Sequence, residues 1–442
     1  MRIVRYFAEL IPLIVFCSII PLWSIAKAST GIKITALILL SAVYLWTVLR
    51  KDKDSSGGKR LRLLKKGSRL VLLALGAIAA ETVILPVYCI RSCESIVNGV
   101  FAVLMPVIAI GIMCFCGVVC IAVGSRQIKV KNHIFMLTLW WCPILNIILL
   151  RNFCQTARRE YVVECDRIEL ENARAESQIC HTRYPLLMVH GIFFRDWQVF
   201  NYWGRIPASL IRNGAVVYYG NQQSTRAVCD GGREIRDTIL KILEETGAEK
   251  VNIIAHSKGG LDSRYAISCL GMDKYVATLT TISTPHKGCD MVDYLLEKLP
   301  DWLAGAIAGR YNRIFSKLGD KNPDFMAGVR DLSAERAKSY DSEMPDSPLV
   351  SYRSVMSVMK SARSAGFPLN AGYMLIKKLN GANDGLVWEE SARHGAYQLL
   401  EPPYKRGISH GDTIDLKREN INGFDVREFY VNLVKNLRQE GY

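Results

Sequence analysis

Residues 100–123 form an apolar run of 24 residues that contains no charged side chain and is interrupted only by Pro106. A helix needs about 20 such residues to cross the hydrocarbon core of a bilayer. Four further apolar stretches lie at residues 7–26, 34–49, 70–90 and 134–150, of which the second and the last are short. The sequence therefore predicts an all-helical, multi-span transmembrane region over residues 1–151, with five candidate helices.

The positive charge of the chain is concentrated in this apolar part. Residues 1–160 contain 20 Lys and Arg against 6 Asp and Glu, so the remaining residues hold only +1 of the total net charge of +15. A nucleic-acid-binding domain needs a positive surface for phosphates, and we therefore expect no nucleic-acid partner. The charge is instead typical of the Lys and Arg bias that orients membrane helices.

The side of the membrane follows from the same bias. The loop 50–69 carries nine Lys and Arg, so we expect it to lie in the cytoplasm together with the N-terminus. Five spans then place everything after Arg151 outside the cytoplasm, which fits the charge distribution best. If residues 134–150 lie on the membrane surface instead, as Pro143 and Asn146 allow, the domain faces the cytoplasm.

The first apolar stretch permits another interpretation. Arg2 and Arg5 precede it, and Ala26-Lys27-Ala28 resembles a signal-peptide cleavage site. Cleavage there would not change the side on which the following domain lies.

Two carboxylates, Glu9 and Glu81, lie within otherwise apolar runs. An ionisable group in such a position marks a candidate site because its burial in lipid is costly. Glu9 is near the end of its segment, where we expect the carboxylate to reach the interface. No partner for Glu81 can be named from the sequence.

Residues 152–183 are rich in charged side chains and predict a polar helix or linker. Beyond Arg151, six cysteines have no C-x-x-C spacing, so neither a zinc ribbon nor a thioredoxin-like motif is supported. They are Cys154, Cys165, Cys180, Cys229, Cys269 and Cys289. An exported domain could pair some of them, but their spacing does not say which.

From Tyr184 onward, short apolar runs alternate with amphipathic helical patterns. This alternation predicts an α/β domain with a mostly parallel sheet. The predicted strands are residues 186–189, 215–219, 251–254 and 276–282, and the predicted helices are residues 232–246 and 261–270.

Ser257 lies between the predicted strand 251–254 and the predicted helix 261–270, which is the layout of a nucleophile elbow. Ala255 and Gly259, two residues to either side, are small enough to let the backbone tighten and expose the hydroxyl. The free N–H groups at the start of the helix point to the place where an oxyanion would develop.

A serine nucleophile needs a histidine base and an acid that orients it. In the hydrolase order of Ser, Asp/Glu, His, the pair Asp384 and His410 fits. His394, only ten residues after Asp384, remains a competitor, whereas His286 comes too early in the chain.

Six segments of the chain resemble, in the same order, the secreted bacterial triacylglycerol lipases of the Pseudomonas and Burkholderia type. They are residues 189–192, 202–210, 251–260, 284–288, 383–387 and 410–412. The resemblance spans about residues 184–420 and covers none of the membrane region. It implies an α/β-hydrolase domain, which we place at residues 184–442.

The same resemblance implies roles for individual residues. Ser257 would be the nucleophile, His410 the base and Asp384 the acid. The backbone N–H groups of Ile192 and Lys258 would stabilise the oxyanion. Ala255 stands where the family usually has Gly, a change that still permits the turn.

These lipases also hold a structural calcium ion with two aspartates. Asp412 matches one of them, but residues 361–371, where the other is expected, contain no Asp or Glu. Because Ca²⁺ prefers six to eight oxygen ligands, we expect no metal, and nothing indicates another cofactor.

Residues 290–348 contain apolar side chains at roughly helical spacing. The pattern alone fits a pair of core helices, whereas the resemblance implies a lid that covers the serine and opens at a lipid surface. Phe193, Phe194 and Trp197 would add apolar surface beside the oxyanion turn.

These features together predict a membrane-anchored serine hydrolase that cleaves carboxylic esters of acyl lipids through an acyl-enzyme. Two alternatives stay open. An acyltransferase could use the same triad with an acceptor other than water, and a membrane sensing protein could use a hydrolase-like domain only for binding.

Overall fold

The computed structural model describes residues 2–26, 29–52, 58–92, 95–192, 201–317, 319–401 and 406–442. These residues form two compact units, Met1–Asn172 and Ala173–Tyr442. Phe193, Phe194 and Trp197, predicted to lie beside the oxyanion turn, fall outside the described residues.

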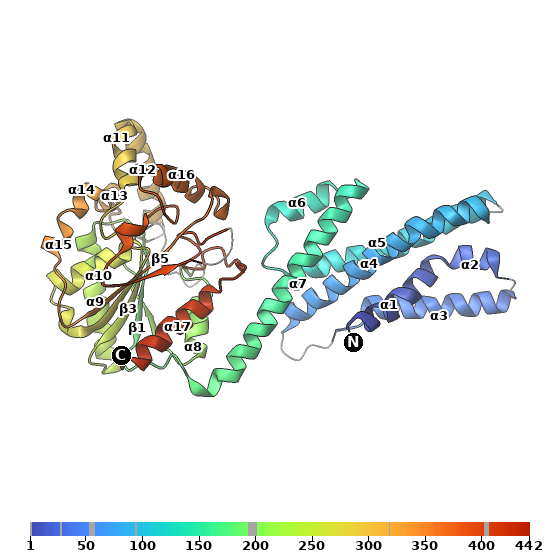
Figure 1. Cartoon of the computed structure of the whole chain (residues 1–442), viewed down its shortest axis with the longest axis horizontal. Helices are drawn as coiled ribbons and strands as arrows, with labels where there is room; N and C mark the ends of the chain where they lie inside the picture. The colour runs from blue at the N-terminus through green and yellow to red at the C-terminus, as the bar shows by residue number, and fades with distance from the viewer. Residues whose placement is uncertain are drawn as a thin grey trace. The chain divides into compact units, whose positions relative to one another are not determined.

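The first unit is helical throughout its described residues (Figure 1). Its helices are α1 (Arg2–Cys17), α2 (Ile19–Ile25), α3 (Thr30–Leu49), α4 (Lys59–Arg91), α5 (Ile96–Gly124), α6 (Val130–Thr138) and α7 (Pro143–Arg174), the last of which runs just past Asn172.

Three of these helices, α3, α4 and α5, are long and apolar enough to cross a membrane. The pair α1 and α2 is bent by 67° at its break, and it adds a fourth span among the described residues if the two helices cross together. Gly67 of α4 and Gly117 of α5 lie against each other, since a Cβ on Gly67 would lie 2.7 Å from the Gly117 carbonyl oxygen. Small residues at such a crossing let two apolar helices approach closely.

The stretch 134–150, predicted as a fifth span, is divided between α6 and α7. Pro143 begins α7, a position that proline tolerates because its missing N–H has no helical partner there. Proline also disfavours a helical backbone at the preceding residue, and Cys142 lies outside both helices. The predicted polar linker 152–183 is mostly the continuation of α7 as far as Arg174.

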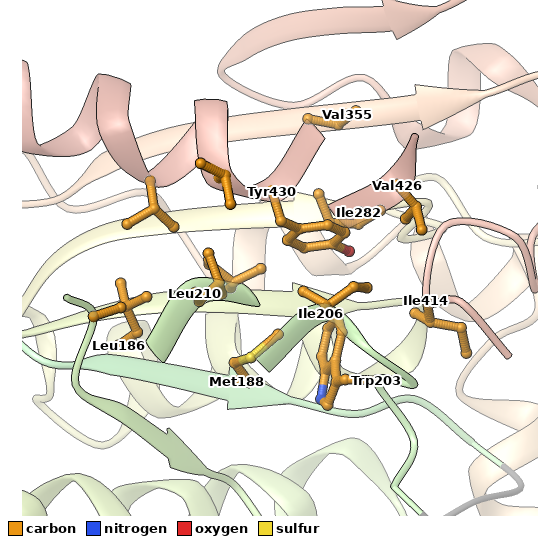
Figure 2. Close-up of a cluster of buried hydrophobic side chains, with 14 of the residues drawn as sticks. Leu186, Met188, Trp203, Ile206, Leu210, Ile282, Val355, Ile414, Val426 and Tyr430 are labelled. Carbon is orange, nitrogen blue, oxygen red and sulfur yellow. The ribbon is translucent and has the colours of Figure 1, made fainter. Parts of the chain in front are cut away.

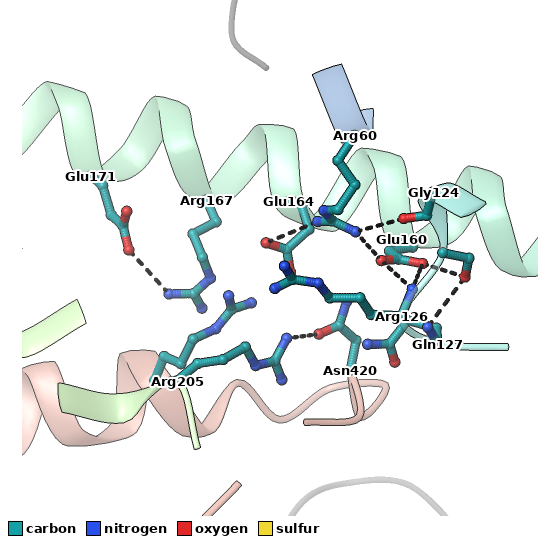
Figure 3. A network of polar contacts seen from close by, with 12 residues as sticks. Arg60, Gly124, Arg126, Gln127, Glu160, Glu164, Arg167, Glu171, Arg205 and Asn420 are labelled. Carbon is teal, nitrogen blue, oxygen red and sulfur yellow. Dashed lines mark hydrogen bonds and ion pairs between the residues drawn. The ribbon is translucent and has the colours of Figure 1, made fainter. Parts of the chain in front are cut away.

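Glu160 of α7 joins three helices of this unit (Figure 3). Its carboxylate accepts hydrogen bonds from Ser125 Oγ at 2.6 Å and from Arg126 N at 3.1 Å, just after the end of α5. It also binds the guanidinium of Arg60 in the first turn of α4, which donates to the Gly124 carbonyl at 3.2 Å. This buried carboxylate therefore fixes α7 against α4 and α5.

The two carboxylates in the apolar runs both have partners. Glu81 accepts a hydrogen bond of 2.7 Å from Ser18 Oγ. Glu9 accepts from Arg69 at 3.0 Å and also binds the guanidinium of Arg50.

The second unit contains a six-stranded sheet in the order β2-β1-β3-β4-β5-β6, and every neighbouring pair is parallel. The strands are β1 (Leu186–Val189), β2 (Val217–Tyr219), β3 (Val251–His256), β4 (Val276–Ile282), β5 (Ser351–Ser357) and β6 (Ala396–Leu400). The predicted mostly parallel α/β sheet is therefore confirmed.

Helices cover both faces of this sheet (Figure 1). They are α8 (Ile206–Arg212) and α17 (Val426–Gln439) on one face, and α9 (Val228–Thr246) and α10 (Lys258–Cys269) on the other. Successive strand residues alternate between the faces, so Leu186 and Met188 of β1 pack with Trp203 and Tyr430, as Figure 2 shows. The intervening Leu187 belongs to the core under α9 and α10.

Residues 290–348 fold into short helices and connecting loops. The helices are α11 (Asp290–Lys298), α12 (Asp301–Lys317), α13 (Phe325–Arg330), α14 (Ala334–Ala337) and α15 (Tyr340–Glu343). Part of this segment packs as core, with Ala308, Phe325 and Tyr340 buried beside Ile192 and Leu261.

Candidate active site

Ser257 lies in a sharp turn between β3, which ends at His256, and α10, which begins at Lys258. Its backbone has φ 53° and ψ −129°, a conformation that L residues rarely adopt and that costs about 1–3 kcal/mol. Hydrogen bonds from Ser257 N to the Ile282 carbonyl at 2.9 Å and from Thr284 Oγ1 to the Ser257 carbonyl at 2.8 Å hold the turn.

The end of β1 lies directly against this turn. A Cβ on Gly191 would lie 2.8 Å from the Ser257 Cβ, and one on Gly259 would overlap the His190 carbonyl oxygen. Only glycine permits these two approaches. They bring the Gly191–Ile192 backbone beside the serine, where an oxyanion donor is needed.

Asp384 and His410 form a buried pair. His410 Nδ1 lies 2.8 Å from Asp384 Oδ2, and His410 N donates to the Asp384 carbonyl at 2.9 Å. The other carboxylate oxygen, Oδ1, accepts from Leu386 N at 3.0 Å and from Val387 N at 2.9 Å. These contacts fix the Nδ1–H tautomer of His410 and leave Nε2 as the nitrogen that can accept a proton.

His256 connects this pair to the nucleophile turn. Its ring centroid lies 4.4 Å from that of His410, and it directly precedes Ser257 in the chain. Its Nδ1 lies 2.7 Å from the Tyr202 hydroxyl and its Nε2 lies 3.2 Å from Thr413 Oγ1, which donates to the His410 carbonyl at 2.7 Å. Complete burial is the main reason that the pKa of His256 lies well below its usual range, and the neighbouring His410 lowers it further. His256 therefore packs against the ring of His410 as a neutral imidazole.

Within the described parts of the chain, no hydrogen bond joins Ser257 Oγ to the His410 ring. Catalytic hydrogen bonds are often long in unliganded enzymes and tighten when substrate binds. The contact between His256 and His410 brings the ring of His410 alongside the turn that holds Ser257.

Residues 184–322 match the family model described as the alpha/beta hydrolase fold. The second unit is an α/β-hydrolase domain. The predicted fold class is thereby confirmed, and the resemblance noted in the sequence holds at the level of a domain related to triacylglycerol lipases.

Triacylglycerol lipases from Pseudarthrobacter phenanthrenivorans and Burkholderia plantarii are each 33% identical over 180 residues. These alignments cover 38% of this chain and 56% and 50% of the two relatives, so the chain spans about half the length of these curated relatives. The triacylglycerol lipase of Pseudomonas fragi is 25% identical over 293 residues, which cover 59% of this chain and 98% of the relative.

Among solved structures, the mature Bacillus licheniformis lipase BlEst2 matches with a TM-score of 0.44 and 22% identity, covering 57% of this chain and 91% of that one. The metagenomic carboxyl esterase MGS0156 matches with a TM-score of 0.45 and 14% identity, covering 59% and 76% of the two chains.

In the hydrolase domain, the competing histidine His394 lies in a different environment. Its Nε2 lies 3.1 Å from Asp346 Oδ1, and its ring stacks on His286 at 4.4 Å between centroids. His286 is buried, with Nε2 3.0 Å from Thr281 Oγ1. Of the two histidines that the order of residues leaves open, His410 contacts Asp384, whereas His394 contacts Asp346.

The side chain of Lys258 is turned into the interior of the hydrolase domain. Its Nζ donates to Asp262 Oδ1 at 2.6 Å, and both side chains are buried. Burial raises the pKa of Asp262 to about 7, although Lys258 acts in the opposite direction. With its side chain directed inward, Lys258 presents only its backbone N–H at the start of α10.

The residues of the hydrolase domain do not fit the calcium ion of the related lipases. Asp412 accepts hydrogen bonds from Ser409 N at 2.9 Å, Ser409 Oγ at 2.7 Å and Arg406 Nη1 at 2.9 Å. The arginine neutralises the carboxylate that a cation would need. The described ranges also contain no group of three or more His, Cys, Asp or Glu side chains arranged to hold a metal.

No sequence pattern indicates the residues that contact the ring of His256 and, through it, the ring of His410. Tyr202 and Thr413 lie 54 and 157 residues from His256, and nothing in their spacing indicates that they meet its ring. His256 itself is next to the nucleophile, and that adjacency was the one clue available.

Proposed function

We propose that this chain is a membrane-anchored serine hydrolase that cleaves carboxylic esters of acyl lipids through an acyl-enzyme. The observation that carries the proposal is the buried pair of Asp384 and His410, packed through His256 against the strained turn of Ser257. Kinship with triacylglycerol lipases and the long apolar helices of the first unit support it.

In this mechanism Ser257 Oγ attacks the ester carbonyl while His410 Nε2 takes the hydroxyl proton. Asp384 stabilises the resulting imidazolium through its 2.8 Å contact with Nδ1. The negative charge on the tetrahedral oxygen is stabilised by the N–H groups of Lys258 and Ile192. His410 then protonates the leaving alcohol, and a water molecule repeats the sequence on the acyl-enzyme to release the acid.

The segment 290–348 supports a lipid substrate. Trp302 of α12 is 74% exposed, and Ile307 and Ile314 of the same helix are also exposed. Ile192, a proposed oxyanion donor, packs in the same cluster as Ala308 of α12, and Tyr311 of that helix packs against this cluster. A helix that is apolar on its open side and joined to the oxyanion turn on the other is suited to act as a lid at a lipid surface.

The number of crossings determines where the hydrolase domain works. With residues 134–150 divided into two helices, the described residues offer at most four spans. Four spans return the chain to the side of its N-terminus, and the basic loop 50–69 favours the cytoplasm for that side. We therefore propose that the hydrolase domain lies in the cytoplasm. The charge distribution alone favoured the other side of the membrane, with the cytoplasm as the alternative.

The test is labelling of the full chain in membranes with a fluorophosphonate probe, together with release of fatty acid from p-nitrophenyl esters of increasing chain length. Ser257→Ala should abolish both signals. Ser268→Ala, which removes a serine from the same helix α10, should keep both. Retained labelling or hydrolysis in Ser257→Ala would overturn the proposal, and acyl transfer to an added alcohol at the expense of free acid would reveal an acyltransferase.

A further inference from the structure

The first unit contains a cavity of about 690 Å³ that is lined only by residues of that unit. The lining comes from α1, from the start of α4 and from the middle of α7, with Asp52 from the segment before α4. Small-molecule sites are commonly 300–1,000 Å³, so this cavity has the size of a ligand site.

The charged residues around the cavity have a net positive charge. Four cations line it against two carboxylates, a net of +2; the cations are Arg5, Lys65, Arg69 and Arg158. Both carboxylates are held by arginine, since Arg69 contacts Glu9 and Asp52 at 3.0 Å each, Arg50 binds Glu9, and Arg5 pairs with Glu9 at 3.4 Å. The wall nevertheless keeps its positive excess, to which Lys65 and Arg158 contribute.

Three cations of this wall, Arg5, Lys65 and Arg158, come from three different helices. Arg5 is 68% exposed, and Arg158 is also exposed. Lys65 Nζ lies 5.6 Å from the centroid of the Tyr161 ring, which lines the same cavity. A phosphate placed between α1, α4 and α7 would thus meet one cation from each helix.

The remaining wall is apolar. Ile3 and Phe7 of α1 are 74% and 51% exposed, and Val162 of α7 is exposed next to Tyr161. A free inorganic anion would gain nothing from these side chains. A ligand with an anionic head and a hydrocarbon tail would contact both parts of the wall.

The position of the cavity along the helices agrees with such a ligand. Arg5 is in the first turns of α1, and Lys65 and Arg69 are in the first part of α4, within the basic stretch 50–69. Positively charged loops mark the cytoplasmic end of membrane helices, and basic pockets between helices on that side bind anionic lipid head groups.

We infer that this cavity binds an anionic phospholipid, with the phosphate between Arg5, Lys65 and Arg158 and the first part of an acyl chain against Ile3, Phe7 and Val162. The site lies in the first unit and uses none of the residues of the proposed hydrolase mechanism.

The test is native mass spectrometry of the full chain in detergent, titrated with dioleoylphosphatidylglycerol, dioleoylphosphatidylcholine or inorganic phosphate. The variant Lys65→Gln/Arg158→Gln removes two cations from the wall. The matched control Arg62→Gln/Arg159→Gln removes the same charge from α4 and α7 at exposed residues that do not line the cavity.

We expect the phosphatidylglycerol to bind and the phosphatidylcholine to bind far more weakly. The cavity variant should lose about thirtyfold in affinity, since each cation near an anionic lipid surface contributes about fivefold. The control should bind as the native chain does. Equal binding of the two lipids, equal loss in the control, or displacement of the lipid by inorganic phosphate alone would overturn the inference.

Two further variants separate a binding defect from other causes. Val162→Trp fills the apolar wall without changing charge and should also weaken lipid binding; unchanged binding would contradict the placement of the acyl chain. Ser257→Ala should bind the lipid as the native chain does, so failure of the hydrolase mechanism and failure of this site give different results.

Discussion

Replacing Asp384 by Asn tests the proposed roles of the buried pair most directly. Asp384 Oδ1 accepts hydrogen bonds from Leu386 N and Val387 N, and these two donors require an oxygen at that position. The Asn side chain must therefore place its amide oxygen there and its NH₂ toward His410 Nδ1. Because an NH₂ group only donates in this contact, Nδ1 must accept, and the ring proton moves to Nε2.

A histidine protonated on Nε2 cannot take the proton of Ser257. We expect kcat to fall by about 10³- to 10⁴-fold, the loss that follows when the acid of a Ser-His-Asp triad enforces the wrong tautomer. At 1.36 kcal/mol for each factor of ten, this corresponds to about 4 to 5.5 kcal/mol of transition-state stabilisation. The substitution is isosteric and keeps the two backbone hydrogen bonds, so the fold should survive.

The assay is steady-state hydrolysis of p-nitrophenyl butyrate, with thermal unfolding recorded on the same preparations. Asp346→Asn is the control, because Asp346 also contacts a histidine, with Oδ1 3.1 Å from His394 Nε2, but lies outside the proposed site. Its kcat should stay within about twofold of the native value. If Asp346→Asn lost activity and Asp384→Asn kept it, His394 would be the base and the reasoning above would be refuted.

Three further results are expected. The double variant Tyr202→Phe/Thr413→Val should lower kcat by about tenfold and leave KM unchanged. It removes two neutral hydrogen bonds, each worth about 1 kcal/mol, that hold His256 against His410. A change in KM alone would contradict a positioning role. Burial raises the pKa of Asp262 from 3.8 to about 7. Between these two pH values the folded chain keeps a proton that the unfolded chain has lost, so the free energy of unfolding should fall as the pH rises from about 4 to 7. Denaturant titrations across this pH range should show a smaller fall for Asp262→Asn than for the native chain. An epitope placed after Tyr442 should be reached by antibody only in opened cells, whereas one placed between α4 and α5 should be reached in intact cells; exposure of both in intact cells would restore the five-span arrangement.

The elements that the sequence predicted well are those with strong local patterns. The buried strands β1, β3 and β4 are short and mostly apolar, as strands covered on both faces are, and the turn at Ser257 follows from small residues between a strand and a helix. The strands β5 and β6 were not predicted. The residues of β6 alternate between exposed and partly buried at the edge of the sheet, and the pattern is too short to distinguish it from a loop.

Long-range contacts account for what the sequence left open. Ser18 lies 63 residues from Glu81, and Asp346 lies 48 residues from His394, so no spacing rule connects either pair. The order of residues allowed both His394 and His410 to serve as the base, and only the fold brings one of them to Asp384. Residues 134–150, the fifth predicted span, are divided between α6 and α7, and Pro143 disfavours a helical backbone at the residue before it.

The order of the parts along the chain has a consequence for how the protein is made. His410 leaves the ribosome 153 residues after Ser257 and long after the apolar helices α3, α4 and α5. The proposed nucleophile therefore emerges without its proposed base, at a time when the nascent chain already has the helices that can insert into a bilayer. If the proposed function holds, synthesis in this order places the chain in the membrane before the catalytic residues are complete.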